Sequence, residues 1–359
     1  MLQNWLNPIH INEILGLEPT PSTAIRHQIK CYDASGLPSL ESVRVAIVGL
    51  GDTSSNAVRK VLYRFNELPN LSIVDLGNIK KESPAFYIPL LTELLQSGII
   101  PILIGNATPS LIPLFQAYKP LKYSINIVSI ERNISDDWEQ ILDTKRSHLL
   151  HLGVIGYQSH IANLGTLALL DKRNSDLARL GKIRSSIDEV EPIIRYADMI
   201  SLDINALKYS EAPAQNEPSP SGLTVEEACM LVRYAGMSDK SSAFNIQGFV
   251  CEKDIENQTA QTIAELVWYY MEGVLNRKND FPASLDNMTE YIVDYKMYGY
   301  QLTFWRSNNS SRWWIQIPVK TIKEKDYRHK LIPCSYQDYQ QASEGKIPDR
   351  LLRAFSHFG

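Results

Sequence analysis

Residues Ala197–Thr224, ADMISLDINALKYSEAPAQNEPSPSGLT, contain a strand, a long polar loop and the start of a helix. The first part, Ala197–Ile204, is largely apolar, has β-branched residues and lacks Pro and Gly, which predicts a short buried strand. Because side chains alternate along a strand, Asp203 and Asn205 are expected on one face at its carboxyl end. Thr224 begins the following helix as its N-cap, with Glu227 in the capping-box position.

The same alternation of buried strands and helices extends from Val43 to Leu275. It predicts an α/β fold with three layers, in which helices cover both faces of a mainly parallel sheet. Functional residues in such folds gather at the carboxyl ends of the strands. Besides Ala197–Ile204, the expected strands are Val43–Val48, Leu71–Val74, Ile99–Gly105, Ser124–Ile130, Leu152–Gln158 and Ala243–Val250.

Composition narrows the class of protein. The chain has 359 residues and a net charge of −4, so it can bury a large core and gives no sign of a nucleic-acid partner. The four cysteines are scattered without metal-site spacing, which favours reduced thiols in a cytoplasmic protein. Apolar runs fall short of the roughly 20 residues of a membrane helix, so no membrane insertion is expected.

The central stretch resembles the metal-binding strand of the ureohydrolase family, which includes arginase, agmatinase and formimidoylglutamase. The family pattern is Ser-x-Asp-x-Asp-x-x-Asp-Pro, followed by Ala-Pro and Gly-Leu-Thr. This chain matches it at Ser201, Asp203, Ala212-Pro213 and Gly222-Leu223-Thr224. It departs where Asn205 replaces the second Asp and Lys208-Tyr209 replaces Asp-Pro.

Active ureohydrolases hold two manganese ions with four Asp and two His. The resemblance implies six corresponding positions here, of which only Asp203 keeps the family residue: Thr108, Ser129, Glu131, Asn133, Asp203 and Asn205. The Glu that anchors the substrate in the family corresponds to Gln247 or Gly248. Hydroxyls and amides are poor substitutes for imidazole and carboxylate as manganese ligands. The sequence therefore predicts a non-catalytic binding or assembly protein with no catalytic residues and no manganese cofactor.

Two alternatives remain open. Glu131 and Asp203 could hold a single metal in a retuned hydrolase of C–N bonds in linear amidines. The strand Val43–Val48 is also followed by Gly49-x-Gly51-x-x-Ser54, and Asp75 ends the next strand, which resembles half of a dinucleotide-binding fingerprint. Asp52 weakens that interpretation, because it puts a negative charge where a pyrophosphate would lie.

The sequence predicts three regions along the chain. Residues 1–40 form a leader expected to pack on the core, residues 41–285 the ureohydrolase-like domain, and residues 286–359 a C-terminal extension. Tyr291–Arg306 and Arg312–Ile317 predict an aromatic hairpin, with short helices after it. Its tryptophans are candidate contacts for a protein partner or for self-association: Trp305, Trp313 and Trp314.

Overall fold

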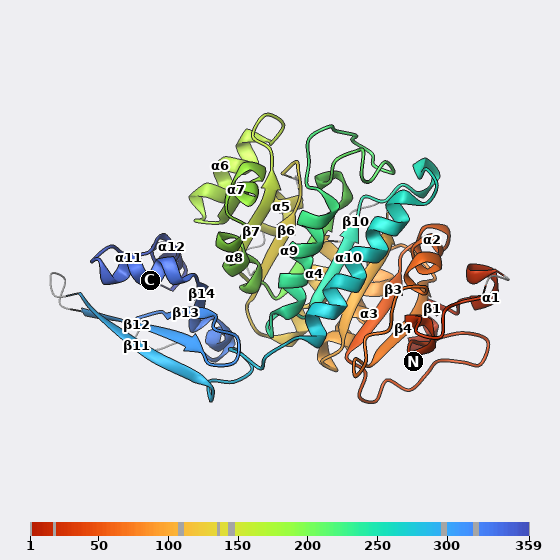
Figure 1. Cartoon of the computed structure of the whole chain (residues 1–359), viewed down its shortest axis with the longest axis horizontal. Coiled ribbons are helices and arrows are strands. Elements are labelled where there is room, and N and C mark those ends of the chain that lie inside the picture. The colour runs from red at the N-terminus through yellow and green to blue at the C-terminus, as the bar shows by residue number, and fades with distance from the viewer. Residues whose placement is uncertain are drawn as a thin grey trace.

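The computed structural model describes residues 2–16, 19–106, 111–134, 137–142, 148–295, 300–318 and 323–358. These residues form an α/β core and a smaller C-terminal unit that projects from one end of it (Figure 1). The N-terminus lies at the opposite end of the core (Figure 1).

The core is organised around a ten-stranded sheet with the strand order β1-β4-β3-β5-β10-β9-β6-β7-β8, in which β2 also pairs with β4. Every pairing is parallel except that of β1 with β4, which confirms the mainly parallel sheet. The strands are β1 (Leu6–Asn7), β2 (Lys30–Cys31), β3 (Val45–Gly49), β4 (Ile73–Ile79), β5 (Ile100–Asn106), β6 (Ile125–Ile130), β7 (Leu149–Tyr157), β8 (Asp176–Arg179), β9 (Met199–Asp203) and β10 (Ala243–Gln247).

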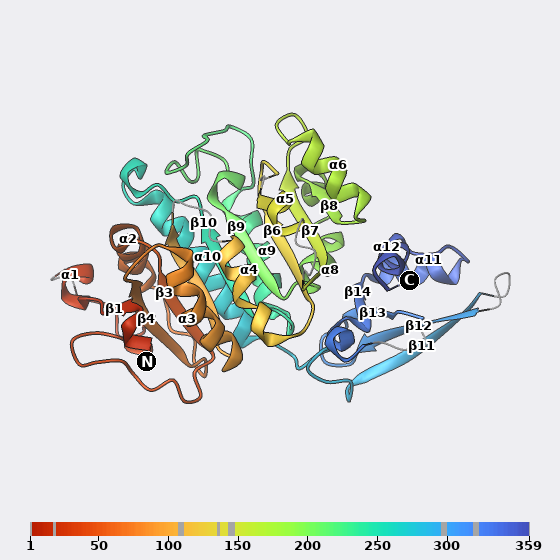
Figure 2. The same cartoon turned by 180° about the vertical axis from the view of Figure 1, so that it is seen from behind.

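Two hydrophobic clusters, one on each face of the sheet, hold the three layers together. One face is covered by α2 (Asp52–Leu62), α7 (Leu180–Ser185), α8 (Glu191–Arg195), α9 (Val225–Met237) and α10 (Gln258–Leu275). The other is covered by α3 (Pro84–Gln96), α4 (Leu111–Ala117), α5 (Asp137–Leu142) and α6 (Leu164–Lys172). Figure 1 shows α9 and α10 in front of the sheet, and Figure 2 shows α3 and α4 on the reverse side.

Helix α9 begins as the sequence predicts. The Thr224 side chain accepts a hydrogen bond from the Glu227 amide, and the Glu227 carboxylate accepts one from the Thr224 amide. This reciprocal pair satisfies two amides that the first helical turn cannot pair internally. The helix therefore starts at Val225, directly after the loop that leaves the central strand.

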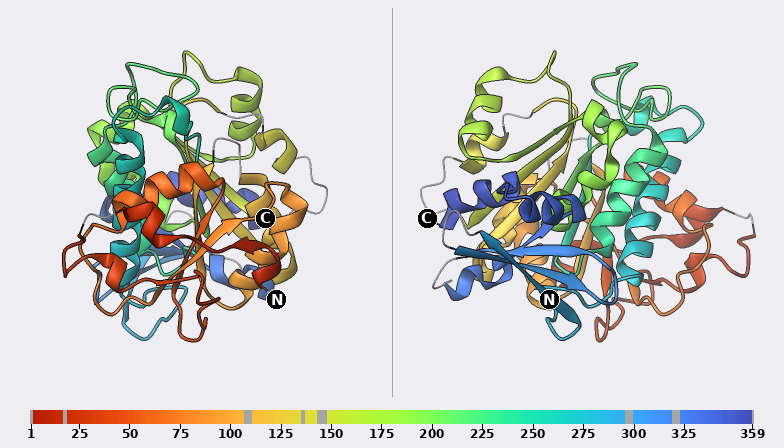
Figure 3. Two further views of the ribbon diagram at one scale, coloured as in Figure 1. Left: turned by 90° about the vertical axis from the view of Figure 1, so that its right-hand side faces the viewer. Right: turned by 60° about the vertical axis from the view of Figure 1, so that its left-hand side comes forward.

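The leader does more than pack on the core. Besides the short helix α1 (Ile11–Leu15), it supplies β1 and β2, which pair with β4 at the edge of the main sheet. The left panel of Figure 3 shows this end of the molecule. Short 3₁₀ segments complete the core at Leu2–Asn4, Ile25–His27, Lys119–Leu121, Ile187–Glu189, Ile204–Ala206 and Cys251–Lys253.

The C-terminal unit has a second sheet rather than a single hairpin. Four antiparallel strands are arranged in the order β11-β12-β13-β14, and helices α11 and α12 follow. The predicted run Tyr291–Arg306 is divided between two strands. The elements are β11 (Met288–Tyr295), β12 (Tyr300–Ser307), β13 (Trp313–Gln316), β14 (Leu331–Cys334), α11 (Tyr336–Ser343) and α12 (Asp349–Phe358). The right panel of Figure 3 shows the two helices beside this sheet.

Alternation along β13 places Trp313 and Trp314 on opposite faces of the small sheet, and both rings are buried. Trp313 packs with Tyr291 and Tyr339 between the sheet and α11. Trp314 packs with Phe281 and Leu331 on the other face. Trp305 is half-buried, so it is the member of the predicted trio with accessible surface.

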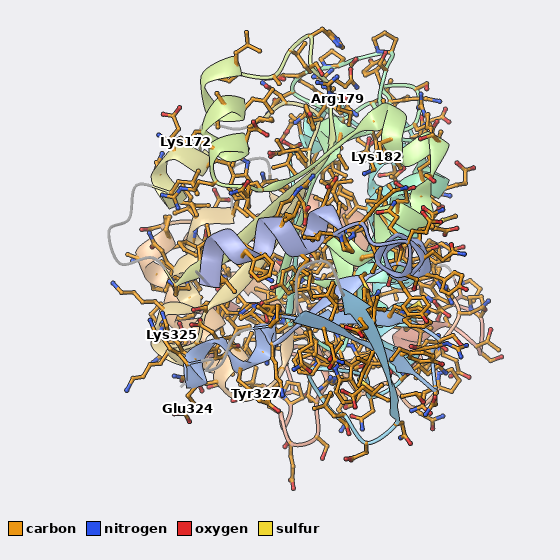
Figure 4. The ribbon with its side chains drawn as sticks, turned by 90° about the vertical axis from the view of Figure 1, so that its left-hand side faces the viewer. Lys172, Arg179, Lys182, Glu324, Lys325 and Tyr327 are labelled. Atoms are coloured by element: carbon orange, nitrogen blue, oxygen red, sulfur yellow. The ribbon has the colours of Figure 1, made fainter. Side chains whose placement is uncertain are left out.

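Arg195 of α8 joins the unit to the core. Its guanidinium donates hydrogen bonds to the Trp313 and Cys334 carbonyls, at 3.1 Å each, and lies 4.3 Å from the centre of the Trp314 ring. The 3₁₀ segment Glu324–His329 adds a second junction just before β14. Figure 4 views the molecule from this side, with Glu324 and Tyr327 in the lower part.

Candidate functional site

The polar residues of interest follow three neighbouring strands at their carboxyl ends. Ser129 of β6 is the register partner of Ser201 of β9, and Ser201 is the partner of Asn245 of β10. The Asn245 amide donates to the Ser201 hydroxyl over 3.0 Å and to the Gln247 side chain over 3.2 Å. Residues that are register partners lie on the same face of a parallel sheet. The three strands therefore carry a continuous polar row at the level of Ser129, Ser201 and Asn245.

This row belongs to the face covered by α3, α4 and α5. Neighbouring side chains on that face, such as Ile127 and Met199, lie in the hydrophobic cluster of those helices. Ile130 and Leu202, one residue out of step, lie in the opposite cluster. Asp203 is two residues beyond Ser201 within β9, so it continues the same face. Glu131 follows the end of β6, and its hydrogen bond from Trp138 of α5 places it on this face as well.

Glu131 is buried, and its carboxylate is hydrogen-bonded to other side chains of the protein. The Trp138 indole donates to Oε1 over 2.7 Å, and the Ser129 hydroxyl lies 3.2 Å from Oε2. Trp138 belongs to α5 and is fully buried. Both carboxylate oxygens thus accept hydrogen bonds from inside the protein, as a buried carboxylate requires.

Asp203 ends β9 and begins a turn. Its Oδ1 accepts hydrogen bonds from the Asn205 amide N–H at 2.8 Å and from the Asn205 side-chain amide at 2.7 Å. This local bonding pattern favours a turn over continued strand. Asn205 therefore lies in the 3₁₀ turn Ile204–Ala206, and the strand alternation predicted for it is wrong.

The surroundings of Asp203 favour its neutral form. Burial raises the pKa of this carboxyl, and the two hydrogen bonds from Asn205 act in the opposite direction. The nearby Glu217 carboxylate raises the pKa further, whereas Arg132 lowers it. The net effect is a pKa above the ordinary value for Asp.

Arg132 and Glu217 complete this cluster, and the sequence analysis assigned neither of them to it. The Glu217 amide donates to Asn205 Oδ1 over 3.0 Å. Arg132 donates to the Glu217 carbonyl over 2.8 Å, and its Nη2 lies 3.3 Å from the Glu217 carboxylate. β6 has ended at Ile130, so strand alternation no longer controls where Arg132 points. No local pattern signals the pair, because its members are 85 residues apart.

Gly248 lies against the Asp203 and Asn205 side chains at the end of β10. A Cβ atom at this position would be 2.5 Å from Asp203 Oδ1 and 3.0 Å from Asn205 Nδ2, and the residue has φ +84°. No side chain fits there without displacing the Asp203 carboxylate. Gln247, the register partner of Asp203, is buried and accepts a hydrogen bond from Asn245.

Asn133 does not extend the polar row. It is exposed and lies beyond the end of β6. Thr108 falls outside the described residues. In the part of the chain that the structure describes, no group of three or more His, Cys, Asp and Glu side chains is arranged to hold a metal ion.

The Gly49–Ser54 turn has a structural role. The Ser54 hydroxyl bonds to the Gly105 carbonyl, and Ser55 bonds to that of Ile104, so the turn is fastened to β5. Asp75 is fully buried and accepts from the Arg59 guanidinium, the Tyr63 hydroxyl and the Gly77 amide. A carboxylate enclosed in this way cannot bind a ribose hydroxyl. The geometry gives no support to the dinucleotide alternative.

A mainly parallel sheet between two helical layers, with its polar residues at the strand ends, defines a three-layer α/β protein. Residues 138–272 match the profile of the arginase family. The segment includes Asp203, Asn205 and Gly248, whereas Ser129 and Glu131 precede it. No curated protein sequence gives a significant match.

Several solved structures share the fold of this chain. A Trypanosoma cruzi formiminoglutamase solved with Mn²⁺ is 16% identical, with a TM-score of 0.62 over 67% of this chain and 96% of that one. The Bacillus subtilis formimidoylglutamase is 16% identical, with a TM-score of 0.62 over 73% and 96%. The Streptomyces clavuligerus proclavaminate amidino hydrolase is 15% identical, with a TM-score of 0.60 over 73% and 100%.

Among the described residues, no helix combines the length and the apolar character needed to cross a lipid bilayer.

Proposed function

We propose that this arginase-superfamily chain is a non-catalytic protein that has lost the dinuclear manganese centre and acts in binding or assembly. The observation that carries the proposal is the state of the Glu131 carboxylate. It is buried and holds hydrogen bonds from Trp138 and Ser129, so coordination of a cation would break contacts that the protein core uses.

The second carboxylate supports the same conclusion. The Asp203 carboxylate accepts two hydrogen bonds from Asn205, and the Asn205 side chain in turn accepts one from the Glu217 amide. Two bridged divalent cations need several anionic ligands for charge balance, and amides and hydroxyls do not supply them. The donor set at these strand ends therefore does not fit the metal pair.

Metal analysis tests the proposal directly. The purified chain is expected to contain no stoichiometric manganese, and added Mn²⁺ should leave its melting temperature unchanged. A ligand that binds only the native state must raise that temperature. The protein should also release no urea from arginine or agmatine and no formamide from formimidoylglutamate.

A variant with the family ligands restored provides the positive control. At the positions of the two family histidines it carries Thr108→His and Glu131→His. At three of the four aspartate positions it carries Ser129→Asp, Asn133→Asp and Asn205→Asp, and Asp203 is already present. Stabilisation of the wild-type chain by Mn²⁺ that disappears in Asp203→Ala would contradict the proposal and favour the single-metal hydrolase.

A further inference from the structure

The outer edge of β11 is a long strand edge without a partner in the described structure. β11 has eight residues and pairs only with β12, in an uninterrupted register from Met288 opposite Ser307 to Tyr295 opposite Tyr300. Alternate residues of an antiparallel edge strand direct their amide and carbonyl groups away from the sheet. Figures 1 and 2 show β11 on the side of the small sheet that faces away from the core.

Other sheet edges are protected in ways that β11 is not. At the edges of the main sheet, β1 has two residues and β8 has four. The other edge of the small sheet, β14, has four residues, includes Pro333 and contacts α8 and α12. Proteins usually protect exposed edges by shortness, Pro, bulges or charged side chains, Lys above all. The charged residues of β11 are acids, Glu290 and Asp294, which repel an acidic strand but not a cationic one. The sequence of β11, MTEYIVDY, has neither Pro nor Lys, and its register shows no bulge.

The side chains of β11 divide between a packed face and an open one. Tyr291 and Val293 pack into the cluster beneath α11 and α12. Glu290, Ile292 and Asp294 are exposed on the other face, with 59% of the Ile292 surface accessible. The edge therefore presents an apolar residue between two acids.

No cation on the neighbouring strand neutralises these acids. Opposite Glu290 lies Trp305, and opposite Asp294 lies Gln301. Neither acid forms an ion pair with any other residue in the described ranges. A strand added outside β11 would place its own side chains directly beside them, where opposite charges are favourable.

We propose that the edge of β11 binds an extended cationic segment of a partner protein by strand addition. The segment would set Lys or Arg beside Glu290 and Asp294 and an apolar side chain beside Ile292. Backbone hydrogen bonds supply affinity and the alternate side chains supply selectivity in this mode of recognition. A second copy of this chain fits less well, because antiparallel pairing centred on Ile292 sets Glu290 against the copy's Asp294.

A pair of designed peptides tests this inference on the full-length chain. The probes are fluorescent eight-residue peptides with blocked ends, one alternating Lys with Val and the other Glu with Val. Fluorescence anisotropy is expected to show saturable binding of the Lys peptide at least tenfold tighter than that of the Glu peptide. Hydrogen exchange at the amides of residues 289–294 should slow when the Lys peptide is bound.

Charge reversal identifies the surface. Both acids are exposed, so Glu290→Lys with Asp294→Lys is expected to fold normally and to reverse the peptide preference. The matched control, Glu13→Lys with Glu41→Lys, changes the net charge equally at two exposed positions far along the sequence from β11, and it should keep the wild-type preference.

Three results would overturn the inference. The first is hydrogen exchange in β11 that does not change when the Lys peptide is added. The second is a loss of peptide binding in the Glu13 and Glu41 control as large as in the Glu290 and Asp294 variant. The third is a wild-type dimer that the Glu290 and Asp294 reversal dissociates. The proposed binding at β11 does not depend on whether the core binds manganese. Failure here leaves the proposed loss of the metal centre to be judged by metal content and melting temperature.

Discussion

The ammonium of Lys240 lies 2.9 Å from Nδ1 of His329, so a residue of the core and a residue of the C-terminal unit share a buried hydrogen bond. His329 Nε2 lies 2.7 Å from the Ser124 carbonyl and donates to it, which leaves Nδ1 to accept from Lys240. Asp198 lies 3.5 Å from the same ammonium, and Arg328 pairs with the other oxygen of Asp198. Burial lowers the pKa of Lys240 to about 7 from an ordinary 10.5, against the opposing attraction of Asp198.

We predict that this lysine makes the protein more stable as the pH rises from 7 towards 10. In that range the unfolded chain keeps the Lys240 proton and the folded chain has lost it, so the unfolded state binds more protons. The free energy of unfolding, taken relative to Lys240→Met, should rise by about 1.4 kcal/mol per pH unit at most. Urea unfolding at several pH values measures it, and a pH-independent difference between the two proteins would contradict the assignment.

We predict that Asp75→Asn costs about 3–5 kcal/mol of stability, because it leaves the buried Arg59 without its counter-charge. Replacing both members, as Arg59→Met with Asp75→Leu, should cost less than the single change, since no charge then stays unpaired. Guanidinium unfolding of the three proteins provides the comparison. If the double variant were less stable than Asp75→Asn, the hydrogen bonds that Tyr63 and Gly77 donate to the carboxylate would matter more than the ion pair with Arg59.

We predict that Gly248→Ala lowers stability more than Gly345→Ala does. Both glycines have similar φ, +84° and +87°, so both substitutions impose comparable backbone strain of about 1–3 kcal/mol. Only position 248 adds a collision with Asp203, because a Cβ at 345 meets nothing within 4 Å. Thermal unfolding separates the two contributions, and equal losses would mean that the Asp203 turn moves aside freely.

We predict that Trp313→Ala and Trp314→Ala each destabilise the chain by about 3–5 kcal/mol, because each ring is buried in a packed cluster. Trp305→Ala should cost less, since that ring is half-buried. Melting temperatures measure the losses. Analytical ultracentrifugation of the same variants shows whether any tryptophan also contributes to association.

Regular periodicity accounts for what the sequence predicts correctly. Buried strands such as β3 and β10 are short apolar runs, and α10 spans Gln258–Leu275 because its apolar residues recur along one face. The capping box at Thr224 needs only residues three apart, so it can be recognised locally. These signals are enough to place Asp203 at the carboxyl edge of the sheet.

The errors arise where local hydrogen bonds or distant contacts take over. Asn205 lies in a turn because the Asp203 carboxylate accepts hydrogen bonds from its backbone and side-chain amides. The pairing of Arg132 with Glu217 depends on how a long loop folds back over the sheet. β14 is four residues long and includes a proline, which is too weak a pattern to reveal a fourth strand.

The two ends of β9 have different neighbours. Asp198 precedes the strand and binds Arg328 of the C-terminal unit, whereas Asp203 ends it at the candidate site. The two residues are five positions apart along the chain, a span of roughly 16 Å in an extended strand. Substitutions that far apart, with no shared partner, combine additively. A double variant at Asp198 and Asp203 should therefore lose the sum of the two single losses in unfolding free energy. Any difference from that sum would measure the coupling free energy between the two ends of β9.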